Sequence, residues 1–90
     1  MVQVIWLPEA LADLDLIRAY VRQFDFAAAQ RLVDRLADAG GSLADFPDRG
    51  RLAGNGRREL VTVPPYLLRY AVTSDAVYIL GVRHSARRPD

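Results

Sequence analysis

Basic side chains and the one histidine gather toward the end of the 90-residue chain. Arg83 and His84 close a run of strand-forming residues, and Arg69 lies in the run before it. Histidine titrates near neutral pH and arginine stabilises a charged phosphorane, so this group could cleave RNA without a metal ion. A histidine that ends a strand beside solvated or ion-paired arginines would give the same pattern. Both interpretations stay open at this point.

Other kinds of site have little support in the sequence. The chain has no cysteine, which excludes disulfides, thiolate zinc ligands and a thiol nucleophile. One histidine and scattered acids show no metal-ligand spacing, and Ser85 directly beside His84 cannot build a catalytic triad. No glycine-rich loop is followed by a helix that could cradle a phosphate. We therefore expect neither a metal ion nor a cofactor.

The two halves of the chain carry opposite charge. Residues 1–48 hold four arginines and eight acids, a net charge of −4, whereas residues 49–90 hold eight arginines and three acids, a net charge of +5. The basic half suits an anionic or acidic partner. No stretch approaches 18 apolar residues and no signal peptide is evident, so we expect a cytoplasmic protein without a membrane segment.

The first half predicts a strand and two helices. Residues 2–6 are strand formers, and Pro8 suits the first position of a helix. Apolar residues then recur at helical spacing, until Asp25 provides a cap for a second helix whose apolar face extends to Phe46. Within that helix we expect a kink or a frayed turn at Gly40–Gly41. A tight turn between the helices predicts a helical hairpin.

The second half predicts strands. Residues 47–56 have turn chemistry and are expected to form a loop. Three strands should follow, the last two joined by a two-residue turn, at residues 57–63, 66–73 and 76–84. The order β-α-α-β-β-β predicts one α+β domain over residues 1–90, with a helical hairpin packed on a small, mainly antiparallel sheet.

Alternation assigns the faces of only one of these strands. It places Arg69 on the open face of the sheet and turns three neighbours toward the helices, namely Tyr66, Leu68 and Tyr70. The final strand is apolar on both alternations. Alternation therefore does not decide whether Arg83 or His84 shares the open face with Arg69.

The first helix has more apolar surface than one packing face needs, because Leu16 and Tyr20 widen its stripe. Such a surplus is typical of a surface that a partner helix covers. The alternative is that these side chains pack in the chain's own core. The candidate partner-binding residues are Leu14, Leu16, Ile17, Tyr20, Val21, Leu32 and Leu36.

Several segments resemble a known family when taken together. The segments are residues 5–14, 46–51, 58–61 and 65–70, with a tail at 82–87 that reads Val, any residue, His, any residue, Ala-Arg. They resemble ParE-like toxins of the RelE/ParE superfamily of bacterial type II toxin–antitoxin systems. The resemblance spans nearly the whole chain. It implies a cytoplasmic toxin that forms a hetero-oligomer with a cognate ParD-like antitoxin of the ribbon-helix-helix type.

The resemblance implies two different targets within that superfamily. ParE-like members are associated with inhibition of DNA gyrase, and RelE-like members cleave mRNA on the ribosome. Leu67 lies where the RNase branch has an arginine, and lysine is absent, so the resemblance favours a gyrase inhibitor that is not an enzyme. The alternative is a metal-independent endoribonuclease that uses Arg69, Arg83 and His84. A third possibility is a degenerate toxin retained only to bind its antitoxin.

These inferences assign a separate surface to each partner. The helical half should bind mainly the antitoxin, and the arginine-rich strands should bind mainly the target. The candidate target-binding residues are Arg58, Arg69, Arg83, His84 and Arg87.

Overall fold

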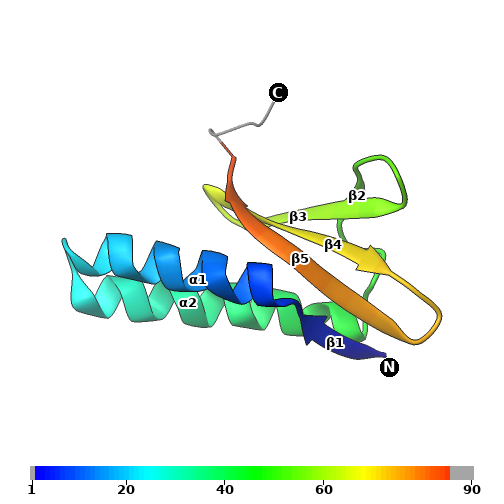
Figure 1. Cartoon of the computed structure of the whole chain (residues 1–90), viewed down its shortest axis with the longest axis horizontal. Helices are drawn as coiled ribbons and strands as arrows, with labels where there is room; N and C mark the ends of the chain where they lie inside the picture. The colour runs from blue at the N-terminus through cyan, green and yellow to red at the C-terminus, as the bar shows by residue number, and fades with distance from the viewer. Residues whose placement is uncertain (1, 86–90) are drawn as a thin grey trace.

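A computed structural model describes residues 2–85, which form a helical hairpin on a five-stranded sheet (Figure 1). The elements are β1 (Gln3–Trp6), α1 (Pro8–Arg22), α2 (Phe26–Gly41), a 3₁₀ turn η1 (Ser42–Ala44), β2 (Arg51–Leu52), β3 (Arg57–Val63), β4 (Tyr66–Val72) and β5 (Ala76–His84). The strand order is β1-β5-β4-β3-β2, in which β1 runs parallel to β5 and the other neighbours are antiparallel. The predicted α+β fold with a mainly antiparallel sheet is confirmed.

The two helices lie side by side, and the tip of their hairpin extends beyond the sheet (Figure 1). Pro8 begins α1, where Leu7 supplies no side-chain cap. Asp25 caps α2 as predicted, because its carboxylate accepts a hydrogen bond from the Ala28 amide at 3.0 Å. The apolar faces of both helices pack against the sheet around Leu36, Leu43, Leu68, Tyr70, Val77 and Ile79. This core fixes the hairpin on one face of the sheet and leaves the other face open.

Of the kink or frayed turn expected at Gly40–Gly41, the structure shows no break inside the helix but a change to a 3₁₀ turn at its end. Helix α2 continues through both glycines to Gly41, and the 3₁₀ turn follows directly. The reason for one glycine is tertiary: a Cβ atom on Gly40 would lie 2.5 Å from the ring of Trp6, so only glycine lets β1 approach the helix this closely. Beyond the helix, Leu43 is buried, but Phe46, the predicted end of the apolar face, has 65% of its surface exposed.

The predicted loop over residues 47–56 contains a short strand. Arg51 and Leu52 of β2 pair with Glu59 and Arg58 of β3. The turn between these strands has three consecutive residues with positive φ at 54–56, including Asn55 at 56°. Such residues reverse the chain tightly, so the glycine-rich segment closes a hairpin where a loop was expected.

Candidate functional site

A register shift in β5 sets the faces of its last residues. Arg69 of β4 pairs with Gly81, but the next residue, Tyr70, pairs with Ile79. Leu80 is therefore an extra residue, and the strand changes phase at that point. Ile79 before the bulge and Val82 after it both point into the core. Simple alternation would have placed them on opposite faces.

The bulge determines which of Arg83 and His84 shares the open face with Arg69. Arg83 pairs with Leu67 and so lies on the open face with Arg69. His84 pairs with Tyr66 and lies on the helix side of the sheet. The rings of Tyr66 and His84 meet edge to face, with centroids 5.3 Å apart. The three residues considered for RNA cleavage are therefore divided between the two faces of the sheet.

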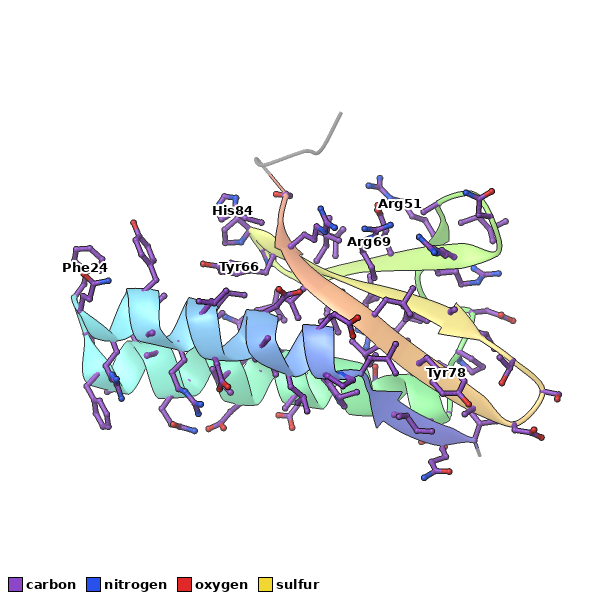
Figure 2. All side chains as sticks on the ribbon, viewed as in Figure 1. Phe24, Arg51, Tyr66, Arg69, Tyr78 and His84 are labelled. Atoms are coloured by element: carbon purple, nitrogen blue, oxygen red, sulfur yellow. The ribbon has the colours of Figure 1, made fainter. Side chains whose placement is uncertain are left out.

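The open face, meaning the sheet face turned away from the helices, is mainly basic. One row across the sheet runs from Arg51 through Glu59 and Arg69 to Gly81. Arg51 forms an ion pair with Glu59 at 3.2 Å. Figure 2 shows Arg51 and Arg69 on the same side of the sheet. With Arg57, which pairs with Ala71, and Arg83 included, the open face carries four arginines and one glutamate.

A pocket of about 490 Å³ lies on the other side, between α1 and the paired ends of β4 and β5. Its lining comes from α1 (Asp13, Leu16, Ile17, Tyr20) and from the sheet (Tyr66, Val82, Arg83, His84). It thus brings together residues predicted for the antitoxin and residues predicted for the target. The two surfaces adjoin at this pocket, although the sequence suggested separate ones.

Asp13 fixes the floor of the pocket, a role that was not predicted. Its carboxylate accepts a hydrogen bond from the Val82 amide at 2.9 Å, directly after the bulge. Gly81 makes room for this contact, because a Cβ atom there would lie 3.1 Å from the carboxylate oxygen. The sequence held a signal: Asp13 lies between Ala10 and Ile17 on the inward face of α1, where an acid needs a partner.

The side chain of Arg58 stabilises the fold. Its guanidinium donates to the carbonyl oxygens of Gly50 at 2.6 Å and Asp48 at 3.3 Å, and it lies 3.6 Å from the Asp48 carboxylate. Its side chain is 22% exposed and faces the loop before β2. Arg58 therefore holds this loop, which leaves little of it to contact a target.

Tyr70 holds the same loop from the core. Its hydroxyl donates to the carbonyl oxygen of Pro47 and accepts from the amide of Gly50, both at 2.8 Å. Burial raises the pKa of the Tyr70 phenol above 10.0, against opposing contributions from the Gly50 amide and Arg58. Gly50 cannot carry a side chain here, because a Cβ atom would lie 2.7 Å from the Tyr70 oxygen. The position of the Tyr70 hydroxyl therefore requires a glycine at position 50.

The predicted antitoxin-binding residues occupy different depths. Leu16 and Tyr20 are 70% and 57% exposed, so the stripe they widen lies on the surface and not in the core. Phe24, which was not a candidate, extends this stripe to the hairpin tip with 73% exposure and meets Tyr20 edge to face. Val21 is half-buried, and three further candidates are half-buried against the core, namely Leu14, Ile17 and Leu32. Leu36, also a candidate, is 1% exposed: it packs in the core and offers no surface in the isolated toxin.

Some predictions fall at the limits of the described chain. Arg87 lies outside the described residues. Within residues 2–85, no three His, Asp or Glu side chains cluster so that they could hold a metal ion. No helix in this part of the chain is long and apolar enough to cross a membrane.

Known proteins resemble this chain in sequence and in fold. The family model for the ParE toxin of the type II toxin–antitoxin system parDE matches residues 4–89. Toxin RelE2 of Caulobacter vibrioides is 54% identical over 87 residues, which cover 97% of this chain and 99% of that toxin. Toxin RelE3 of the same organism is 34% identical over 84 residues, which cover 90% and 91% of the two chains.

A solved structure of the chromosomal ParDE TA system from P. aeruginosa has the same fold. It matches with a TM-score of 0.81 at 24% identity, over 93% of this chain and 96% of that chain. The helical hairpin on a mixed sheet is thus shared with this toxin–antitoxin structure. Given the family match over residues 4–89, the chain belongs to the ParE toxin family and is the toxin of a type II toxin–antitoxin system.

Proposed function

We propose that this toxin inhibits DNA gyrase by binding, without a chemical step of its own. The observation that carries the proposal is the separation of Arg69 and His84 onto opposite faces of the sheet. Metal-free RNA cleavage needs a base at the 2′-hydroxyl and cations at the same phosphate. A single phosphodiester cannot contact both residues across the sheet. The basic open face instead favours recognition of an acidic or anionic target.

Leu67 supports the same conclusion. It occupies the position where the resemblance to the RNase branch would require an arginine, and its side chain is 8% exposed beneath the open face. It therefore places no positive charge between Arg69 and Arg83. The open face consequently has cations at its ends and middle but an apolar residue at the position that would stabilise a cleaved phosphate.

A type II toxin has a cognate antitoxin as its partner. We propose that an antitoxin helix covers the exposed stripe of α1 formed by Leu16, Tyr20 and Phe24. These side chains recur at spacings of four residues, so they lie along one face of the helix and its extension. A partner helix can bury such a row as a helix in a groove. The stripe leads into the pocket, so a bound antitoxin would also approach Arg83 and His84.

Assays with purified toxin and gyrase test whether gyrase is the target. Supercoiling of relaxed plasmid should stop, while mRNA in a translating extract should stay intact. The Arg69→Glu variant should lose inhibition, and Arg31→Glu on α2 is the matched control because it makes the same charge change on an exposed helix residue. Unimpaired supercoiling at saturating toxin, or equal loss in the two variants, contradicts the proposal.

The second candidate is an endoribonuclease, and the pocket is the observation that favours it. Tyr66 and His84 line it from the helix side and Arg83 borders it at the end of β5, so a histidine and an arginine adjoin one pocket without Arg69. This alternative predicts mRNA cleavage that His84→Ala abolishes and Arg69→Gln leaves unchanged. The same translating extract distinguishes the two candidates.

A further inference from the structure

We propose that the open face binds the phosphate backbone of duplex DNA through a diagonal of three arginines, Arg57, Arg69 and Arg83. This arginine diagonal deepens the proposed function, since a DNA contact beside gyrase would strengthen inhibition of an enzyme that works on DNA. For that biological meaning it rests on the proposed function. Its test uses DNA without gyrase, so the two proposals can fail separately.

The register places the three arginines at regular intervals. Arg69 on β4 has Glu59 as its partner on β3, and Arg57 lies two residues further along that strand. On the other side Arg69 has Gly81 as its partner on β5, and Arg83 lies two residues further in the opposite direction. Each step crosses one strand and two residues, which corresponds to about 8 Å between Cα atoms. The diagonal therefore spans about 16 Å with a cation at each end and one in the middle.

These arginines differ from their neighbours in having no partner within the described chain. Arg49 donates to the hydroxyls of Ser42 and Thr62. Arg58 donates to the carbonyl oxygen of Gly50, and Arg51 pairs with Glu59. Among residues 2–85, the side chains of Arg57, Arg69 and Arg83 take part in no ion pair or hydrogen bond. Arg69 is half-buried as well. A partly desolvated guanidinium without a partner is costly, which is the condition that an external anion relieves.

The surroundings of the diagonal favour a duplex backbone over other anions. Ala71, two residues along β4 from Arg69, presents only a methyl group to the open face, and Gly81 opposite Arg69 presents no side chain, so a rigid backbone can approach the sheet. Proteins that bind single strands add aromatic side chains on which bases stack. On the described open face Tyr78 lies in the row of Arg57 and Ala71, but Leu67, not an aromatic side chain, lies between Arg69 and Arg83. A repeating array of charges also matches regularly spaced cations better than an irregular acidic peptide does.

The test measures how the affinity of the full-length toxin for a short DNA duplex depends on salt. Three phosphate contacts predict a slope of log K against log salt of at least about −2.7, or about a 40-fold loss of affinity between about 50 and about 200 mM. Each of Arg57→Gln, Arg69→Gln and Arg83→Gln should reduce the slope by about 0.9, leaving about a 12-fold loss over the same range. Arg31→Gln, an exposed arginine on α2, should leave the slope unchanged.

Three results would overturn the proposal. One is a slope that the diagonal variants and Arg31→Gln change equally, which would mean general electrostatic attraction. Another is tighter binding to single-stranded RNA of the same length. The third is equal affinity for polyglutamate of the same charge, with the same response to the variants, because the open face would then fit an acidic protein. Unchanged circular dichroism in each variant excludes unfolding as the cause of a lost slope.

Discussion

Replacing Tyr20 with alanine is expected to weaken antitoxin binding while leaving the toxin folded. The side chain lies in the middle of the α1 stripe, between Leu16 and Phe24 along the helix. It is 57% exposed in the isolated toxin, so a partner helix has most of the ring left to cover. The variant therefore separates a contribution to binding from a contribution to the fold.

The magnitude follows from the exposed area. A whole aromatic side chain has about 150–250 Å² to bury, so the exposed 57% amounts to about 85–140 Å². At about 25 cal/mol per Å², complete coverage would contribute about 2–3.5 kcal/mol. That corresponds to about a 30- to 400-fold increase in the antitoxin Kd.

The cost to the fold should be small because two effects offset each other. The variant loses the edge contact with Phe24, whose ring centroid lies 5.4 Å away at the surface. Alanine, however, has the higher helix propensity, by up to about 0.7 kcal/mol. The melting temperature of the free toxin should consequently change little.

Isothermal titration of the antitoxin into each toxin variant measures the effect. Leu52→Ala is the matched control, because Leu52 is 72% exposed but lies on β2, at the sheet edge opposite β1. It should bind the antitoxin as the unaltered toxin does. The reasoning is refuted if Tyr20→Ala binds within about threefold of the unaltered toxin, a difference of about 0.65 kcal/mol, or if Leu52→Ala weakens binding as much.

Further predictions concern the scaffold. Tyr70→Phe leaves the buried groups of the loop before β2 without partners and should lower the free energy of unfolding by about 2–3 kcal/mol in urea denaturation. Because burial raises the folded-state pKa of Tyr70, its stabilisation is complete below pH 10.0 and declines as pH rises toward the folded pKa; a Tyr70→Phe variant whose stability declined as steeply there would contradict this. Gly40→Ala should destabilise by about 1–3 kcal/mol through its clash with Trp6, seen in thermal melts. Gly41→Ala, which meets no atom within 4 Å and has helical φ, should instead stabilise by about 0.5–1 kcal/mol; equal effects at the two glycines would refute the packing argument.

Local sequence patterns were sufficient to predict a helix or strand wherever one of its faces is buried. The helical spacing of apolar residues predicted α1 and α2, and Asp25 marked the second helix because a capping carboxylate acts on its own first turn. The exact bounds of β3 and β5 followed from turn residues next to strand formers. The surplus apolar stripe was also predictable from local spacing, because Leu16 and Tyr20 widen the apolar surface of α1 beyond what one packing face covers.

Contacts between residues far apart in the sequence determined the features that local patterns did not predict. The role of Gly40 depends on Trp6, and the role of Gly50 depends on Tyr70; each pair is far apart in the sequence, so no local signal predicts it. β2 likewise forms only because β3 offers it a partner. Local propensity is a weak guide when a close tertiary approach sets the requirement.

The placement of the basic residues shows both contributions together. From the sequence alone came the identity of the fold, the segregation of charge and the group Arg69, Arg83 and His84 as the residues worth considering. The tertiary structure decided which of them can act together. One extra residue in β5, held by Asp13 from α1, shifts the strand's phase, so Arg83 joins Arg69 on the open face and His84 turns toward the helix. Strand alternation has a period of two, and a single inserted residue reverses every face that follows it.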